Sequence, residues 1–464
     1  MAEAKKGKEK EDGGVVADIV KFIKEQWLLF LILILGFFIW FYDLEIGILA
    51  LAGTIFLGWV AWKFWVHYIQ QDFISGIDFV LLEIIPPREV LRSPKAMELF
   101  ITNALYHWSM KGGKEQYWQG AVWFWFSLEL VSIEGQVHFY LRTPTRLRSL
   151  IETQMYAQYP QAQVKAVEDY TLAVDEITPE SAWTGWGCEF ALKNKEAYPI
   201  KTYVDFGLDK DPKEEYKVDP ISPVVEFFGS LQKGEQAWMQ IVITPSKKEY
   251  GTWFKKHDWV AEAQKEVFRY LAPYTAVKDE GQRIEVRVPD FVKKPVEGMS
   301  AKITKLGFDT GIRVMYVAKK ELIDPAHFTN SRKSLRLIFR QYARPDSNEL
   351  TRINSAQPDA LNTSFFMLSP KQVMILANRM LHEYRERSFF HLPMRHHLFN
   401  VHVFKGPLLM IVKQFWLPYV HPETYVLNVE ELATLWHFPG QILKVPTLER
   451  IESKEASPPT NLPI

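Results

Sequence analysis

The sequence lacks several features that define common classes of protein. It has one cysteine, Cys188, in 464 residues, which excludes an intramolecular disulfide and a multi-cysteine metal site within one chain and suits a reducing compartment. We interpret Cys188 as a small buried side chain. Lysine plus arginine equals aspartate plus glutamate at 55 each, so the chain has no overall charge to attract nucleic acid or an acidic substrate. Any such partner must bind a local patch.

Motifs for catalysis and cofactor binding are also missing. The sequence has no G-x-x-x-x-G-K-[ST] segment, which excludes a P-loop ATPase, and no H-E-x-x-H, G-x-S-x-G or glycine-rich dinucleotide loop. We therefore predict no enzyme activity, no catalytic residue, no cofactor and no metal. A metal-dependent hydrolase remains the less favoured alternative, although the spacing of its ligands would match no standard zinc pattern. Its cluster would comprise His382, Glu383, His391, His396, His397 and His402.

Two long apolar runs follow residues 1–26, which we predict to be a disordered juxtamembrane tail. Residues 27–42 and 46–66 are separated only by an acidic connector and predict a transmembrane helical hairpin. The first run would be about 24 Å long at 1.5 Å per residue, slightly short of a hydrocarbon core of about 30 Å. Lysines precede the first run and none lies in the connector, so we expect a two-span protein of the cytoplasmic (inner) membrane with both termini in the cytoplasm. Membrane lipid is then a partner.

The clearest structural pattern lies within residues 74–175. Phe126–Val131 and Gln136–Leu141 are β-rich runs joined by a Glu134-Gly135 turn. Thr143-Pro144 then predicts the start of an amphipathic helix. A strand at 79–85 and a helix starting at Ser93-Pro94 precede these runs, and a strand at 164–167 follows the second helix. The order β-α-β-β-α-β predicts a ferredoxin-like domain, in which two helices cover one face of a four-stranded antiparallel sheet.

Residues 176–355 carry a weaker version of the same order. We predict a second ferredoxin-like domain with a helical insertion at 247–295. Its expected elements are a β-rich segment at 185–206, a short helix after Asp219-Pro220, strands at 238–243 and 307–318, a helix at 330–343 and a strand at 349–353. The predicted fold class is therefore α+β, with tandem ferredoxin-like units after the membrane hairpin.

The last segment, residues 356–464, is predicted to be an irregular α+β segment that ends in an arm. We expect a helix at 370–387, short strands at 398–403 and 408–412, and a helix at 428–437. Asn428 and Glu431 form a capping box at the start of that last helix. From residue 446 the sequence is polar and rich in proline, which favours an extended arm on a surface or a partner.

A local basic patch lies in the predicted helix 330–343 and just beyond it. The simplest interpretation is a face that contacts only solvent, but lipid headgroups and DNA phosphate are both possible ligands. A membrane adaptor that contacts lipid or DNA is therefore an alternative function. The candidate phosphate- or lipid-contacting residues are Arg332, Lys333, Arg336, Arg340 and Arg344.

Several segments of the chain resemble one known family. They are IPPREVLRSPKAMELF (85–100), SLELVSIEGQVHFYLRTP (127–144), LIETQMYAQYPQAQV (150–164), LNVEELATLWHFPG (427–440) and PTLERIESKEASPPTNLP (446–463). The pattern resembles the membrane-anchored, non-motor N-terminal region of bacterial type IV secretion and conjugation ATPases of the FtsK/HerA class. In those ATPases a segment like the last one leads into the motor, and this sequence ends where that motor would begin.

The resemblance implies a membrane-anchored, non-enzymatic scaffold that recruits a separate motor ATPase of a secretion or DNA-transfer machine. A homo-oligomer is a further possibility. We expect the helix at 428–437 to pack on the body and the arm beyond residue 445 to face the ATPase. The candidate partner-docking residues are Leu432, Leu435, Trp436, Arg450 and Glu452.

Overall fold

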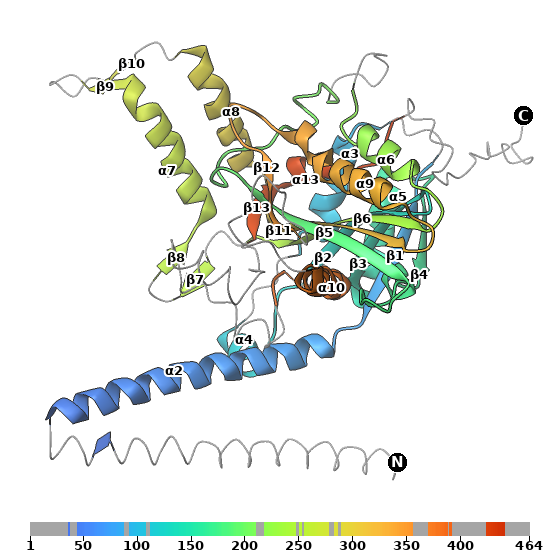
Figure 1. The fold of residues 1–464 in the computed structure, drawn as a ribbon. Coiled ribbons are helices and arrows are strands. Elements are labelled where there is room, and N and C mark those ends of the chain that lie inside the picture. Colours follow the sequence, from blue (N-terminus) through green and yellow to red (C-terminus); the bar gives the residue numbers. More distant parts are fainter. Residues whose placement is uncertain are drawn as a thin grey trace, which may run out of the picture. The chain divides into compact units, whose positions relative to one another are not determined.

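The protein has a mixed α+β fold built on one main antiparallel sheet (Figure 1), which confirms the predicted class. The structure, a computed structural model, describes residues 36–37, 44–87, 92–107, 112–209, 218–246, 250–252, 255–277, 283–285, 289–355, 370–387, 389–391 and 424–440. These residues divide into two compact units. One contains the helices α2 (Leu44–Ser75) and α4 (Gly113–Trp118), and the other contains the sheet with the helices that cover it.

Four strands from the first half of the chain form one side of the sheet. They are β1 (Phe79–Ile85), β2 (Phe126–Ile133), β3 (Gln136–Pro144) and β4 (Gln163–Val167). Their order is β2-β3-β1-β4, and all pairs are antiparallel. The turn between β2 and β3 has positive φ at both Glu134 (51°) and Gly135 (87°), the backbone of a type I′ hairpin. The predicted strand at 79–85 and the predicted Glu134-Gly135 turn are confirmed.

Four strands from the second half repeat this order on the other side. They are β5 (Trp183–Leu192), β6 (Glu235–Pro245), β11 (Gly307–Lys319) and β12 (Leu350–Ser355). Their order is β12-β5-β11-β6, so each half places its fourth strand outermost and its second strand innermost. The two innermost strands, β2 and β6, pair antiparallel from Phe126↔Ile243 to Ile133↔Gln236. This β2–β6 seam joins both halves into one sheet.

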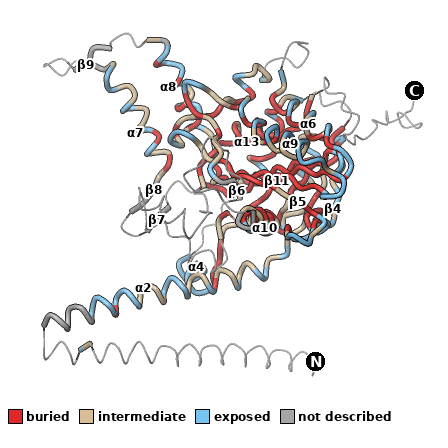
Figure 2. The backbone as a smooth tube through the Cα atoms, viewed as in Figure 1, coloured by how far each residue is buried: buried red, intermediate tan, exposed pale blue. Residues whose placement is uncertain are grey.

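Helices cover both faces of the sheet (Figure 1). One face carries α3 (Lys95–Phe100), the π-helical η1 (Ile101–Leu105), α5 (Arg148–Gln158), α6 (Ser222–Gly229), α9 (Pro325–Leu337), η5 (Ile338–Tyr342) and α13 (Val429–Leu435). The opposite face, here called the α10 face, carries α10 (Pro370–Glu386). The short strand β13 (Tyr425–Asn428) leads into α13 and pairs with β11. Figure 2 shows that burial is concentrated in the strands, and β6 is buried at every position.

A helical pair interrupts the connection between β6 and β11. α7 (Trp259–Leu271) and α8 (Asp290–Thr304) pack together through Ala263 and Met299. Short strand pairs accompany them, β7 (Tyr250–Thr252) with β8 (Lys255–His257) and β9 (Thr275–Val277) with β10 (Arg283–Glu285). The predicted insertion at 247–295 therefore contains α7 and the first turns of α8, which continues through Pro295.

The predicted start of the second helix at Thr143-Pro144 is wrong. β3 continues through these residues because Thr143 pairs with Val80 and Pro144 with Phe79 in the ladder with β1. One 3₁₀ turn, η2 (Thr145–Leu147), follows, and α5 begins only at Arg148. The helix predicted to start at Ser93-Pro94 is α3, whose N-cap is Pro94, without a side-chain cap hydrogen bond.

The described helices include none that combines the length and the apolarity needed to cross a bilayer. The first predicted span, 27–42, lies outside the described residues except for Gly36 and Phe37, and the second, 46–66, lies within α2. The described parts of the segment 356–464 belong to the central core, where Leu376, Leu427 and Trp436 are buried. The predicted strands at 398–403 and 408–412 lie outside the described residues.

Candidate functional site

A row of polar side chains crosses the α10 face of the sheet at a single register position. Each member is the direct cross-strand neighbour of the next, so all of them project from the same face. The order across the strands, from β1 to β5, is Glu83, Tyr140, Glu129, Gln240, Arg313 and Glu189. Four of these residues, from Glu129 to Glu189, are fully buried. Charged groups are rarely buried unless they are paired, so each needs a partner.

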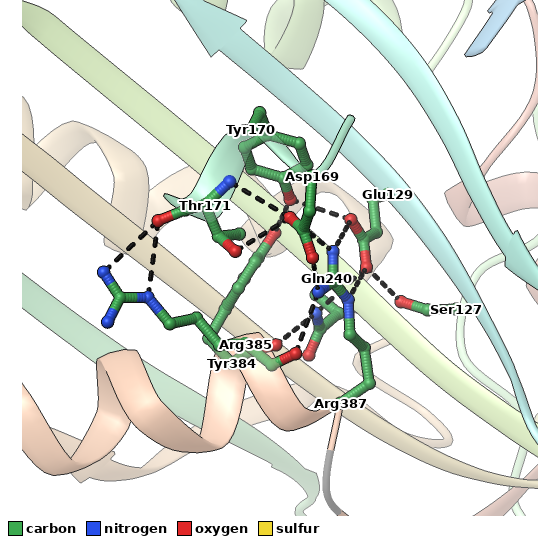
Figure 3. Close-up of polar contacts among 9 residues, drawn as sticks. All are labelled: Ser127, Glu129, Asp169, Tyr170, Thr171, Gln240, Tyr384, Arg385 and Arg387. Atoms are coloured by element: carbon green, nitrogen blue, oxygen red, sulfur yellow. Dashed lines mark hydrogen bonds and ion pairs between the residues drawn. The ribbon is translucent and has the colours of Figure 1, made fainter. Parts of the chain in front are cut away.

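Glu129 is the centre of a buried hydrogen-bond network (Figure 3). Its Oε1 accepts hydrogen bonds from Ser127 Oγ (2.6 Å), Gln240 Nε2 (3.1 Å) and Arg387 Nε (2.9 Å). Its Oε2 accepts from Tyr170 Oη (2.8 Å) and Arg387 Nη2 (3.2 Å). Such a two-pronged arginine–carboxylate pair is stronger and more directional than a neutral hydrogen bond. The carboxylate therefore has five donors in place of water.

Arg387 connects this carboxylate to a second one. Its Nη2 also donates to Asp169 Oδ1 (3.2 Å), its Nη1 pairs with Asp169 Oδ2, and Nη1 donates to the backbone carbonyl of Arg385 (2.8 Å). Arg387 follows α10 directly and has a φ of 51°, a left-handed conformation that is uncommon outside glycine. This backbone conformation turns the chain at the helix end, and the surrounding ion pairs hold it there.

The electrostatics favour the charged forms of Asp169 and Arg387 and the neutral forms of the two phenols. Burial opposes the charge of Asp169, but the charge and hydrogen bonds of Arg387 outweigh it and lower the pKa of that carboxyl. Burial also disfavours the Arg387 cation, yet the carboxylates of Glu129 and Asp169 raise its pKa well above the usual value. Burial and the nearby Glu129 raise the pKa values of Tyr170 and Tyr384, whose hydroxyls are 2.8 Å apart.

A second buried cluster fastens α10 to the other half of the sheet. Arg313 Nη2 lies 3.0 Å from Glu189 Oε1 and 3.5 Å from Glu383 Oε2, and Nη1 donates to the Glu383 carbonyl (2.5 Å). Arg379 Nε in turn donates to Glu383 Oε1 (3.2 Å). The Phe389 ring covers the guanidinium of Arg313 at 3.9 Å. These two clusters, here called the Glu129 network and the Arg313 cluster, tie one helix to both sides of the seam.

The residues predicted as a possible metal cluster do not converge in the described part of the chain. His382 Nε2 lies 3.3 Å from Glu176, whereas Glu383 is engaged by Arg313 and Arg379. The ring of His391 lies tilted beside that of Trp125, with centroids 5.6 Å apart. Among the described residues, no three histidine, cysteine, aspartate or glutamate side chains are grouped to hold a metal ion. His396, His397 and His402 lie outside them.

The described residues predicted to dock a partner are part of the core. Leu432, Leu435 and Trp436 are buried, and the predicted packing of this helix on the body is confirmed. The Trp436 Nε1 donates to the backbone carbonyl of Glu129 (3.2 Å), directly at the seam. Its ring and that of Phe438 contact Phe139 edge-on, at 5.9 and 5.2 Å. Arg450 and Glu452 lie outside the described residues.

Polar bonds reinforce this C-terminal helix. Asn428 and Glu431 form the predicted capping box at its start, which is confirmed. Glu431 also forms a fully buried ion pair with Lys302 Nζ at 3.0 Å and accepts from the Ile200 amide at 3.0 Å. The segment after the helix is held as well, because Asp219 binds His437 Nε2 at 2.9 Å and the Gly440 amide at 3.2 Å.

The five residues of the predicted basic patch have unequal surroundings. Lys333 and Arg340 are exposed, whereas Arg332 and Arg336 are half-buried and engaged in interactions of their own. Arg344 pairs with Asp346 at 3.4 Å and with Asp205 at 3.7 Å. Cys188 is buried on β5, and burial raises the pKa of its thiol, so the interpretation of this cysteine as a core side chain is confirmed.

The fold and these clusters define an α+β protein with one continuous antiparallel sheet whose buried charges clamp a helix across the seam. The chain belongs to a family described as a domain of unknown function, DUF8128, whose model matches residues 124–380. This span is more than half of the chain and runs from just before β2 into α10. No curated protein matches the chain.

Sequence reasoning did not identify the Glu129 network. One signal was present, because Glu129 is the only charged residue in the strand FSLELVSI and a charge inside a buried strand requires a partner. The partner could not be read from the sequence, since Arg387 lies 258 positions away.

Proposed function

We propose that the chain is a membrane-anchored, non-enzymatic scaffold subunit that docks a separate motor ATPase of a type IV secretion or DNA-transfer machine. The resemblance of five of its segments to the non-motor region of such ATPases suggests the machine. The observation that carries the docking role is the anchoring of the C-terminal segment. Trp436 binds the seam and Gly440 binds Asp219, so the proline-rich sequence that follows starts from a fixed point on a rigid body.

We infer that this body is a tandem of ferredoxin-like units, comprising residues 74–175 and 176–355. The support is the strand order, which places the second strands of both halves at the seam and the fourth strands at the outer edges. Buried ion pairs tie the α10 segment to both sides of the seam, which supports a tandem that acts as one mechanical unit. A scaffold that positions a motor needs such rigidity, whereas the buried charges of the site engage one another and are shielded from any substrate in solution.

The membrane attachment is proposed to run through residues 27–66, in the cytoplasmic membrane with both termini in the cytoplasm. Support comes from α2, where the side chains of Ile55, Phe56 and Trp59 are 65, 60 and 57% exposed. Large apolar side chains in such numbers are unfavourable in water and indicate an apolar partner. Lipid fits a helix that follows a lysine-rich tail and an apolar run.

The docking role is tested by shortening the arm. Removal of residues 446–464 from the full chain should leave its melting temperature unchanged, because the last core residue in the described part of the chain is Phe438. The same deletion should abolish co-purification of a co-expressed P-loop ATPase of the FtsK/HerA class. A matched control keeps the arm and exchanges the charges of Arg450 and Glu452, which should weaken recovery only partly. Undiminished recovery of the ATPase with the shortened chain would refute the docking role.

A second candidate function is a lipid- or DNA-contacting adaptor, which the exposure of Lys333 and Arg340 favours. Each phosphate contact removed should reduce the salt dependence of binding by about one unit of slope. The double variant Lys333→Ala/Arg340→Ala should therefore bind anionic vesicles or DNA more weakly and with a flatter salt dependence. Lys165→Ala, a change of another exposed lysine, serves as the control. Equal binding by both variants would leave the basic patch as a solvated face.

A further inference from the structure

The side chains of α2 change character along the helix. Large apolar side chains exposed to solvent come first, at Leu51, Ile55, Phe56 and Leu57. Tryptophan and tyrosine follow at Trp59, Trp62, Trp65 and Tyr68. Polar residues complete the sequence at His67, Gln70, Gln71 and Asp72. An apolar zone, an aromatic zone and a polar zone in this order match the hydrocarbon core, the interface and the aqueous phase of a lipid bilayer.

A second element of the same compact unit adds two rings to the aromatic zone. α4 places Tyr117 5.9 Å from Trp62 and Trp118 6.3 Å from Trp65, measured between ring centroids. The Trp65 Nε1 donates to the Tyr117 carbonyl at 3.3 Å. The rings nevertheless stay open to solvent, since Trp118 is 64% exposed. α4 therefore displays aromatic surface instead of burying it.

The attachment of α4 to α2 is close and depends on a glycine. Gly120, just after α4, has a φ of +66°, and a Cβ atom there would lie 2.0 Å from the carbonyl oxygen of Ile69. Only glycine allows this backbone contact. This contact therefore sets the position of α4 along α2 and holds the rings of Tyr117 and Trp118 beside the aromatic zone.

We propose that the aromatic belt, defined as Trp59, Trp62, Trp65, Tyr68, Tyr117 and Trp118, lies in the headgroup region of a lipid bilayer, so that α4 is a second lipid-contacting element of the chain. This inference rests on the proposed membrane attachment and extends it to α4, a segment that lies well after the two apolar runs in the sequence. Tryptophan and tyrosine favour this region because their rings are apolar and their N–H or O–H groups are polar.

The distribution of the exposed apolar side chains on α2 favours lipid over a protein partner. With 3.6 residues per turn, those at positions 55, 56, 57 and 62 project over more than half of the helix circumference. A partner helix or groove would need a single apolar stripe, whereas lipid surrounds a helix on all open sides. Two exposed lysines, Lys63 beside Trp59 and Lys114 on α4, are suited to headgroup phosphates at the same level.

The depth of α4 can be measured with one introduced thiol. Wild-type Cys188 is buried, so the folded chain should resist labelling and supplies the blank. The full-length variant Trp118→Cys carries an environment-sensitive fluorophore and is reconstituted into vesicles of phosphatidylethanolamine and phosphatidylglycerol. Glu321→Cys, at an exposed position of the sheet unit, is the control. Lipids with a spin label close to the headgroup should quench the fluorophore at 118 strongly, shift its emission to the blue and leave the one at 321 unaffected.

Each result has a distinct meaning. If the chain fails to float with the vesicles at all, the proposed membrane attachment is wrong. If it floats and the label at 118 is no more quenched than the label at 321, the attachment stands and the interfacial role of α4 is wrong. Tyr117→Cys, labelled in the same way, decides the matter if Trp118→Cys does not fold.

Discussion

Arg387 and Glu129 lie 258 positions apart in the chain and meet as a buried two-pronged ion pair, with Nε to Oε1 at 2.9 Å and Nη2 to Oε2 at 3.2 Å. Glu129 belongs to β2 at the seam, and Arg387 directly follows α10. The pair therefore holds α10 against the line where the two sheet halves meet.

Removal of the arginine should reveal the strength of this attachment. We expect Arg387→Met to destabilise the chain by about 3–5 kcal/mol, because Glu129 would stay buried without its cation. Arg269→Met, at a side chain that is 74% exposed, should change stability by less than about 0.5 kcal/mol. Guanidinium unfolding of the full chain measures both. Equal stability of the two variants would show that the ion pair contributes nothing.

Trp436 should contribute through its volume and through one hydrogen bond. Trp436→Ala should cost about 3–5 kcal/mol as a large buried side chain. Trp436→Phe keeps most of the ring and loses the N–H bond to Glu129, for which about 1–3 kcal/mol is expected. The control is Phe268→Ala, at a ring that is 73% exposed. If the phenylalanine variant were as unstable as the alanine variant, the volume and the hydrogen bond of Trp436 would not contribute separately as expected.

Acid should loosen the C-terminal segment through Asp219. Burial alone would raise the pKa of this carboxyl, but the charge and hydrogen bond of His437 and the amides of Ile221 and Gly440 lower it. The folded state therefore favours the carboxylate. The resulting stability is present above the unfolded pKa of about 3.9 and is lost as the pH falls through the lower folded value.

Asp219→Asn should consequently flatten the acid limb of a plot of melting temperature against pH. The variant should be less stable than wild type near neutral pH, and the difference should shrink toward about pH 3, below the unfolded pKa. Parallel curves for the two chains over that range would rule out Asp219 as a contributor to acid sensitivity.

The contact between α2 and α4 can be tested apart from any membrane. Gly120→Ala combines a clash at Ile69 with an unfavourable positive φ, so the loss should exceed about 1 kcal/mol. Gly113→Ala is the matched control, since no atom lies within 4 Å of its added methyl. Hydrogen exchange of amides 112–122 should accelerate in the first variant alone. Unchanged protection in Gly120→Ala would mean that α4 does not depend on this contact.

Local chemistry explains which parts of the fold could be predicted. The Glu134-Gly135 turn follows from the positive φ that glycine permits, and the Asn428–Glu431 capping box joins residues three positions apart. The start of α5 was mispredicted because ladder pairing with β1 held Thr143 and Pro144 in an extended conformation. Tertiary pairing of this kind has no signature in the residues themselves.

The site was less accessible from sequence for the same reason. Glu431 was recognised as a capping residue, but its ion pair with Lys302 joins positions 129 apart. Periodicity identified the helix at 370–387 correctly, yet nothing within it indicated that Glu383 and Arg387 turn toward β11 and β2. Long-range charge pairing requires the strand register, which only the folded sheet supplies.

The packing of the C-terminal segment on β3 means that part of the core can form only late in translation. Trp436, which covers Phe139 and binds the Glu129 carbonyl, is translated 307 positions after Glu129. At about 5–20 residues per second, the ribosome needs on the order of 15–60 s to translate the chain from Glu129 to Trp436. Throughout that interval the surface around Phe139 should lack its cover, and during the first part of it, until Pro245 has been made, the edge of β2 should also lack β6. A nascent chain of this protein should therefore be a persistent chaperone client until its last hundred residues have emerged.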